Sequence, residues 1–302
     1  VWIGSIVNNF STHAASPVVR WRRKPFLMWS EDWWWPTGIE GRLARLFGRW
    51  VARSAAALVA ASSKARQFFE SAGADPARIV VAPNACAVPR SGSPEEIRAV
   101  HASVPAGKGP LLLYLNRVVE YKGLDVLLRA FAGLPLECAE ARLVVVGDGP
   151  FKPACERLAG ELGLGSRVRF VGAGGPETVG AWDDVADVYV HPARVLASGR
   201  VRAEAWGFTI NEALSLGCPV VATDAVAAAV DLVEEGSSGH VVPSGDVQAL
   251  ADALARICRR ADRSQMGERG RCRVMSEFTP RRQAEGFASA VDIALAHRPR
   301  GR

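Results

Sequence analysis

Short, mainly apolar segments alternate with helical segments over the second half of the chain. LLLYL, RLVVV and VRFV are such segments, in which Arg142 and Arg169 are the charged residues, and GLDVLLRAFAGL and FKPACERLAGELG between them have helical spacing of apolar residues. Strands that are apolar on both faces belong to parallel sheets, which need a crossover helix after each strand. The alternation therefore predicts a doubly wound α/β domain over residues 110–277, with ligands at the carboxyl ends of its strands.

The same alternation precedes residue 90 in a weaker form. We predict strands at VWIGSIV, PFLMWS, ALVAAS and RIVVAPNA, and helices at RLARLFGRWVARSAAA and SKARQFFESAG. Residues 1–90 are thus interpreted as the later part of a second Rossmann-like domain, and residues 91–109, rich in Pro, Gly and Ser, as a linker. Because the chain opens on a strand-like segment, we expect this N-terminal domain to be incomplete.

Composition narrows the class of protein without selecting a partner. The 302 residues are 49% hydrophobic and 23% charged, with no apolar run long enough to cross a bilayer and no signal peptide, which favours a cytoplasmic protein. The six cysteines form no C-x-x-C pair, and we expect no metal site. The net charge of +6 is compatible with anionic small molecules, a membrane surface or nucleic acid.

Two cations follow the LLLYL segment, in the sequence NRVVEYKGLDVLL. Arg117 and Lys122 fall between a predicted strand and the next helix, where free helix N–H groups also lie. Lysine is rare in this chain, so a lysine placed before a glycine is informative. The pattern predicts an anion site suited to a diphosphate, and the alternative is a pair of solvated loop residues.

The segment EAWGFTINEAL carries two glutamates, Glu204 and Glu212. Thr209 and Glu212 have the S/T-x-x-E spacing of a capping box, which gives Glu212 a structural interpretation. Glu204 precedes the helix and has no such local explanation. A carboxylate there accepts hydrogen bonds from hydroxyl groups, which suits a sugar.

Two weaker candidates also lie at predicted strand ends. GDGP at 147–150 lacks the spacing of a phosphate-binding loop, and we interpret it as a tight turn. His191 in VYVHPA is isolated, and a lone histidine is more often structural, but it falls on the predicted ligand edge.

The helix predicted at RLARLFGRWVAR is basic. Arg42, Arg45, Arg49 and Arg53 follow one face and apolar side chains are offset from them. A solvated helix face is the default interpretation. Attachment to a membrane surface is the alternative, which the tryptophans of the preceding WSEDWWWP favour.

Together these motifs resemble the retaining glycosyltransferases of family four, which have the GT-B fold of two Rossmann-like domains. NRVVEYKGLDVLLRAF, VVVGDGP, VRFVG, EAWGFTINEAL, GCPVVATD and GSSGHVVPSGD occur in the order in which that family has them. The resemblance extends over nearly the whole chain. It also implies that residues 278–302 form a C-terminal helix that crosses back to the N-terminal domain.

The resemblance implies roles for individual residues. Arg117 and Lys122 would hold the donor diphosphate, Glu212 would bind the ribose, and Glu204 would contact hydroxyls of the transferred sugar. The remaining donor contacts would come from glycines and their neighbours: Gly207, Phe208 and Thr209 at the turn, and Gly172 beside the base. The family requires no metal and no cofactor beyond the nucleoside diphosphate sugar, and it uses no protein nucleophile.

The chain departs from the family in the N-terminal cleft. Many members have a histidine after a strand of that domain, whereas this chain has WSED; Ser30, Glu31 or Asp32 could replace it, and Glu31 is our choice as the second catalytic residue. In addition, Ala227 stands where relatives often have a glycine.

The resemblance predicts transfer of a sugar from a nucleotide sugar to a glycan or lipid-linked acceptor, in polysaccharide or glycolipid assembly. We expect a cytoplasmic enzyme with peripheral contact at the inner face of the membrane through the Arg42–Arg53 helix, and no nucleic acid partner. Two alternatives stay open at this point: a truncated, non-catalytic nucleotide-sugar-binding module, and a GT-B-type sugar-nucleotide epimerase.

Overall fold

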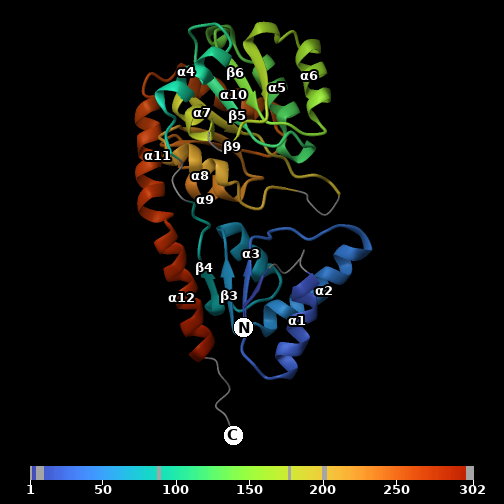
Figure 1. Cartoon of the computed structure of the whole chain (residues 1–302). Helices are drawn as coiled ribbons and strands as arrows, with labels where there is room; N and C mark the ends of the chain where they lie inside the picture. Colours follow the sequence, from blue (N-terminus) through green and yellow to red (C-terminus); the bar gives the residue numbers. More distant parts are fainter. Residues whose placement is uncertain (1, 5–9, 87–89, 176–177, 199–202, 297–302) are drawn as a thin grey trace. The chain divides into compact units, whose positions relative to one another are not determined.

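The structure is a computed structural model that describes residues 2–4, 10–86, 90–175, 178–198 and 203–296 (Figure 1). The chain divides into two compact units. Unit 1 comprises residues 1–85, 196–206 and 278–302, and unit 2 comprises residues 86–195 and 207–277. Each unit has a parallel sheet with its own hydrophobic core.

Unit 2 contains a six-stranded parallel sheet with the order β10-β9-β8-β5-β6-β7. Its strands are β5 (Leu111–Leu115), β6 (Arg142–Val146), β7 (Val168–Gly172), β8 (Val188–His191), β9 (Val220–Thr223) and β10 (Gly239–Val242). Its α-helices are α4 (Pro94–Ser103), α5 (Leu124–Ala132), α6 (Lys152–Glu161), α7 (Val179–Val185), α8 (Phe208–Ser215), α9 (Ala227–Leu232), α10 (Val247–Arg259) and α11 (Arg263–Glu277). Short 3-10 turns are η2 (Glu120–Lys122), η3 (Leu136–Cys138) and η4 (Gly165–Arg167). The prediction of a doubly wound α/β fold is confirmed.

The strands of unit 2 other than the edge strand β7 are largely buried on both faces, as their mainly apolar sequences predict. All five residues of β5 are buried. Alternate residues Leu112 and Tyr114 enter the core that α5 and α10 cover, together with Leu143 and Val145 of β6. Burying one side chain of this size contributes about 1.5 to 3 kcal/mol, so this core is the main source of stability for unit 2.

Unit 1 contains a four-stranded parallel sheet with the order β1-β2-β3-β4. Its elements are β1 (Trp2–Gly4), α1 (Phe10–Trp21), β2 (Leu27–Ser30), α2 (Gly38–Ser54), β3 (Ala57–Ala60), α3 (Ser63–Ser71), η1 (Pro76–Arg78), β4 (Ile79–Val81) and α12 (Pro280–Ala296). Residues 5–7 of the expected first strand and residues 297–302 lie outside the described residues.

The two faces of the unit 1 sheet alternate along each strand, as the strand period requires. Met28 and Leu58 point into the core formed with α2 and α3, while Leu27 and Val59 face Ala290 of α12. A Cβ at Gly286 of α12 would stand 2.7 Å from the Cβ of Ala82, so this glycine allows the helix to lie close to the sheet. Helix α12 therefore belongs to unit 1, beside β3 and β4 (Figure 1).

The stretch 91–109 differs from the linker that we expected. It contains α4, whose start is a capping box in which Ser93 accepts from the Glu96 N–H and the Glu96 side chain accepts from the Ser93 N–H. This stretch is part of unit 2: the Gly92 N–H donates to Asp184 of α7 at 2.7 Å. Prolines and serines that suggested a linker are here the signals of a helix start.

No described helix has the length and apolar character needed to span a membrane.

Candidate functional site

The order of strands in unit 2 reverses direction at β5. From β5 the chain continues to β6 and β7 on one side, and the later strands β8, β9 and β10 lie on the other side. The loops that leave the carboxyl ends of β5 and β8 therefore diverge, and in open α/β sheets the crevice between such loops is where ligands bind. Both loops carry residues that the sequence singled out, namely Arg117 and Lys122 after β5 and His191 at the end of β8.

The two cations of the loop after β5 differ in the exposure of their side chains. The Arg117 side chain is exposed and donates from Nη2 to the Tyr121 hydroxyl at 3.3 Å. Lys122 lies in η2 and is only 8% exposed, with its Nζ donating to Oδ1 of Asn116 at 2.9 Å. A buried ammonium group is costly to desolvate unless polar partners surround it, so its position at a ligand edge points to an anionic ligand.

Glycines bring the neighbouring loops close to this one. Gly123 has a left-handed conformation with φ of +69°, and a Cβ there would collide with the carbonyl oxygen of Pro192 after β8. In the GDGP turn, a Cβ at Gly147 would collide with the Asn116 carbonyl oxygen, and one at Gly149 with the Val118 carbonyl oxygen. The GDGP segment is a turn, as predicted, and its glycines are needed because it packs directly on the β5 loop.

A buried chain of hydrogen bonds runs from Lys122 to the start of α8. Asn116 accepts from Lys122 and donates from Nδ2 to the Tyr189 hydroxyl at 2.8 Å, and that hydroxyl donates to Oγ1 of Thr209 at 2.6 Å. Nδ1 of His191 lies 3.4 Å from both hydroxyl oxygens. The chain joins three elements, and neither Asn116 nor Tyr189 was predicted from the sequence.

Burial fixes the protonation states in this network. It raises the pKa of the Tyr189 phenol well above its ordinary value, so this group stays a neutral donor. Burial, and secondly the charge of Lys122, lower the pKa of His191 well below its ordinary value. His191 is therefore neutral near pH 7, which agrees with a structural more than an acid–base role.

Helix α8 begins two residues earlier than the sequence prediction. Its N-cap is Gly207, with φ of +101°, and no side chain caps it. Thr209 is thus inside the first turn and bonds to Tyr189, so the predicted capping box of Thr209 with Glu212 is wrong. The reason is that Gly207 adopts a left-handed conformation, which starts the helix two residues earlier than the capping pattern requires.

Glu212 therefore has no capping role, and its surroundings are those of a half-buried carboxyl group. Burial raises its pKa above the ordinary value. Asp183 of α7 contributes a second carboxyl, which is buried and receives no hydrogen bond from the residues that the structure describes. Burial, followed by the charges of Glu212 and Asp184, raises its pKa strongly. The sequence analysis missed Asp183, since a single acid on a short helix carries no motif.

Two further predicted residues lie at the same edge of the unit 2 sheet. Gly172 ends β7 with φ of +79°, and the space where a Cβ would stand is open. Phe208, in the first turn of α8, is 44% exposed. Both positions leave backbone accessible near the carboxyl ends of the strands.

The other two predicted catalytic residues, Glu31 and Glu204, are both in unit 1. Glu31 follows β2, and its Oε1 accepts from Nδ2 of Asn84 at 2.8 Å. The backbone carbonyl of Glu204 accepts from the indole N–H of Trp33 at 2.9 Å, which brings the segment 203–206 beside the WSED sequence. The structure therefore brings two carboxylates together that are far apart in the sequence.

Electrostatics distinguish the three candidates in WSED. Burial raises the pKa of Glu31, the hydrogen bond from Asn84 opposes this, and the charges of Asp32 and Glu204 raise it further. Asp32 is buried and accepts a hydrogen bond from the Ser30 hydroxyl at 2.7 Å. Ser30 and Asp32 thus bond to each other, whereas Glu31 interacts with the charge of Glu204.

The two glutamates of the EAWGFTINEAL segment fall in different units, because the division of the chain lies between Trp206 and Gly207. Unit 1 holds Glu31 and Glu204. Unit 2 holds the donor-side candidates, namely Arg117, Lys122, Gly172, Gly207, Phe208, Thr209 and Glu212.

Two sequence models of known protein families match this chain. The sequence model described as "Glycosyl transferases group 1" matches residues 96–273, more than half of the chain. The chain belongs to this family. A second model, of a "Glycosyl transferase 4-like domain", matches residues 6–85. These two matches account for most of the chain and agree with the resemblance to family four.

Several curated group 1 relatives share about a third of their residues with this chain over part of their length. The GDP-mannose-dependent alpha-(1-6)-phosphatidylinositol monomannoside mannosyltransferase of Mycobacterium tuberculosis is 32% identical over 173 residues, 57% of this chain and 44% of that protein. The D-inositol 3-phosphate glycosyltransferase of Nocardia farcinica is 30% identical over 243 residues, 78% of this chain and 51% of that protein. The chain spans about half the length of these relatives.

Solved structures share the fold of this group 1 chain. Sucrose-phosphate synthase from Thermosynechococcus elongatus has a TM-score of 0.76 at 21% identity, covering 98% of this chain and 73% of that one. Anabaena HepE in complex with UDP-glucose has a TM-score of 0.75 at 19% identity, covering 98% and 78%. The fold class is therefore the predicted one, with two Rossmann-like domains of the GT-B type.

Proposed function

We propose that this chain transfers a sugar, with retention of anomeric configuration, from a nucleoside diphosphate sugar to a glycan or lipid-linked acceptor. The observation that carries the proposal is the buried Lys122 beside the strand-order reversal of unit 2, with its Nζ held by Asn116. A fixed cation at that edge suits a diphosphate leaving group. Family membership, the GDP-mannose dependence of the Mycobacterium tuberculosis relative and the complex of Anabaena HepE with UDP-glucose support the same substrate class.

In the proposed donor complex, Arg117 and Lys122 bind the diphosphate and the N–H groups of the first turn of α8 face its oxygens. Glu212 accepts hydrogen bonds from the ribose hydroxyls, and the backbone at Gly172 flanks the base. The half-buried environment of Glu212 strengthens such bonds, since fewer water molecules compete for the carboxylate.

In the proposed transfer step, the bond between the anomeric carbon and the phosphate oxygen breaks while the acceptor oxygen bonds to the same face of that carbon. The acceptor proton goes to the leaving phosphate, so no protein nucleophile is needed. Arg117 and Lys122 stabilise the negative charge that grows on the diphosphate, which is the task that a metal performs in other transferases. Glu204 positions hydroxyls of the sugar, and Glu31 acts on the acceptor side.

The proposed location is the cytoplasm, with peripheral contact at the inner face of the membrane through α2. The exposed apolar residues of α2 support this location, because a purely solvated helix face is polar.

The donor site is tested by calorimetry with UDP, GDP and ADP sugars on Lys122→Ala and Arg117→Ala. The matched controls are Lys108→Ala and Arg157→Ala, which remove the same charges from exposed positions of unit 2. We expect at least a tenfold loss of affinity for the two site variants and none for the controls, since each removes a charge-assisted contact of about 1.5 to 3 kcal/mol. Equal affinity in site and control variants would sink the donor-site assignment.

Retention and metal independence need separate measurements. The anomeric configuration of the product, read by NMR at early reaction times, should equal that of the donor, and a chelator should leave the rate unchanged. Release of an epimer without an acceptor would instead identify an epimerase. Donor binding without any product would identify a binding module.

A further inference from the structure

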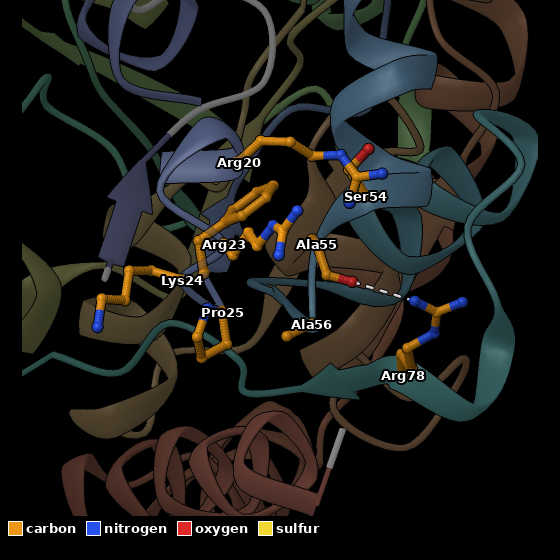
Figure 2. A pocket seen from close by; sticks show the side chains of 9 residues that line it. Arg20, Arg23, Lys24, Pro25, Ser54, Ala55, Ala56 and Arg78 are labelled. Atoms are coloured by element: carbon orange, nitrogen blue, oxygen red, sulfur yellow. Dashed lines mark hydrogen bonds between the residues drawn. The ribbon is translucent and has the colours of Figure 1, made fainter. Parts of the chain in front are cut away.

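A basic pocket lies in unit 1, at the end of the sheet opposite Glu31. It has a volume of about 490 Å³ and is formed where α1 and α2 end and where β2 and β3 begin (Figure 2). Its lining residues are Arg20, Arg23, Lys24, Pro25, Phe26, Ser54, Ala55, Ala56 and Arg78. Four of these are basic and none is acidic. Because Glu31 follows the carboxyl end of β2, this pocket is separate from the proposed acceptor side.

The cations of the pocket are largely unneutralised. Arg78 pairs with Asp75 at 3.2 Å and donates from Nη1 to the Ala55 carbonyl at 3.2 Å. For Arg20, Arg23 and Lys24, the described part of the chain provides no ion pair, and the sequence has no acidic residue before Glu31. Figure 2 shows Arg20 and Arg23 approaching the Ser54–Ala56 segment from one side and Arg78 from the other, while Lys24 points away. Like charges gathered in one hollow attract an anion.

The backbone of Arg23 has a left-handed conformation, which is energetically unfavourable for a residue other than glycine. Its φ is +51°, and no other non-glycine residue in the described ranges has a positive φ. The N–H of Arg23 bonds to the Arg20 carbonyl and that of Lys24 to the Val19 carbonyl, which is the Schellman arrangement that normally places a glycine here. An arginine in this conformation is disfavoured, and such outliers concentrate at binding sites.

Helix α2, which ends at this pocket, turns an apolar stripe outward. Ile39, Leu43, Leu46 and Trp50 are 77%, 64%, 70% and 37% exposed, and their spacing of four, three and four residues puts them on one face. The buried residues of α2 lie on the other side of the helix: Gly41, Gly48, Val51 and Ala52. The four exposed arginines of α2 flank the stripe: Arg42, Arg45, Arg49 and Arg53.

The stripe and the pocket adjoin each other. A second hollow is lined by Leu46, Arg49, Trp50, Arg53 and Ser54, and Ser54 also lines the basic pocket. Near the same end of α2, α1 ends with Trp21, which is 76% exposed and lies under the guanidinium of Arg22 at 5.3 Å. Apolar and aromatic side chains beside arginines match the boundary between lipid headgroups and acyl chains.

We propose that this face of unit 1 docks on an anionic lipid bilayer, with the basic pocket receiving a headgroup phosphate and the α2 stripe inserting among the upper acyl chain segments. The proposal deepens the peripheral attachment suggested above. Charge complementarity selects the occupant: the arginines match anionic headgroups, and the four exposed apolar residues would gain nothing from a nucleic acid backbone. A phosphate seated at the end of α2 would also fix the direction of the helix on the membrane.

The test is co-sedimentation of the full chain with phosphatidylcholine vesicles, with and without phosphatidylglycerol, in the absence of sugar donor. We expect binding only to the vesicles that contain phosphatidylglycerol, with weakening at high salt. Arg20→Gln with Arg23→Gln should reduce the partition coefficient by roughly tenfold or more, because each basic residue near an anionic surface contributes about a fivefold factor. Leu43→Ser with Leu46→Ser should reduce it as well.

The matched control is Arg157→Gln with Arg169→Gln, two exposed arginines of unit 2, which removes the same charge and should leave binding unchanged. An equal loss of vesicle binding in this control would mean that only the net charge of the chain matters. It would overturn the proposal that the pocket receives a headgroup phosphate. Soluble glycerol phosphate that raises the Tm of the full chain, together with no binding to the vesicles that contain phosphatidylglycerol, would assign the pocket to a free phosphate. A wild-type dimer that the Leu43→Ser, Leu46→Ser variant dissociates would assign the stripe to a second copy. The test needs no transfer reaction, so its failure and the failure of the proposed transferase are distinguishable.

Discussion

Replacing Tyr189 by phenylalanine tests whether the buried hydrogen-bond chain of unit 2 holds Lys122, the lysine of the proposed donor site. The phenyl ring fits the same space, so the change removes only the hydroxyl, which accepts from Asn116 at 2.8 Å and donates to Thr209 at 2.6 Å. Tyr189 is fully buried, and water cannot replace the lost partner. An unsatisfied buried donor costs about 1 to 3 kcal/mol, so we expect the free energy of unfolding to fall by about 2 to 3 kcal/mol.

The same substitution should weaken donor binding at a distance from the lost hydroxyl. Asn116 uses its amide to bond Tyr189 and its carbonyl to bond Lys122, so losing the first bond frees the side chain to rotate. Lys122 Nζ then loses its fixed position. We expect about a fivefold loss of affinity for a nucleoside diphosphate. This loss corresponds to about 1 kcal/mol, the net free energy that one hydrogen bond contributes.

The measurements are denaturant unfolding and calorimetry with a nucleoside diphosphate. The control is Tyr114→Phe in β5, which removes the bond at 3.1 Å to the Arg117 carbonyl and should cost about 1 kcal/mol of stability. If Tyr189→Phe is no more destabilising than Tyr114→Phe, or if it binds nucleotide as tightly as the wild type, the network does not position Lys122.

Three other substitutions test separate parts of the structure. Gly123→Ala should lower the free energy of unfolding by at least about 2 kcal/mol in denaturant, because it adds a clash with the Pro192 carbonyl to the strain of a positive φ. The control Gly163→Ala, also at positive φ but in open space, should lower it by only about 1 kcal/mol. Equal losses in the two variants would refute the clash. Asp183→Asn should flatten the pH dependence of unfolding free energy. The folded-state pKa of Asp183 is raised, so the native state binds the extra proton and wild-type stability falls as pH rises above about 4; an unchanged slope in the variant would show that Asp183 does not titrate this way. Glu204→Ala should abolish sugar transfer and leave free nucleotide binding intact, and parallel loss of both in calorimetry and turnover assays would mean that Glu204 is structural.

The strands and the order of motifs were readable from local sequence. LLLYL is apolar throughout and RLVVV is apolar after Arg142, and only a sheet covered on both faces can bury such segments. The loop of Arg117 and Lys122 follows from that assignment, because each parallel strand must be followed by a connection at its carboxyl end. These inferences depend on neighbours in the sequence, which is why they held.

Helix boundaries were less predictable, because the same residue types and patterns occur both at helix ends and in other parts of a structure. Helix α1 was not predicted, since it contains Pro17 and several small polar residues that usually mark loops. The S/T-x-x-E pattern occurs both at Ser93, where it caps a helix, and at Thr209, where it does not. What decides between them is the backbone conformation at Gly207, which the pattern does not encode.

Sequence by itself determined the fold class, the family and the position of the loop between β5 and α5, because these depend on periodicity and on motifs within short segments. Only the tertiary structure decided which side chains share a site. Asn116 and Tyr189 meet because β5 lies beside β8 in the sheet. Glu204 and Glu31 lie in the same unit because the segment 196–206 is part of unit 1. Parallel pairing joins strands that are distant along the chain, so such contacts are fixed by the packing of the whole unit and not by any local pattern.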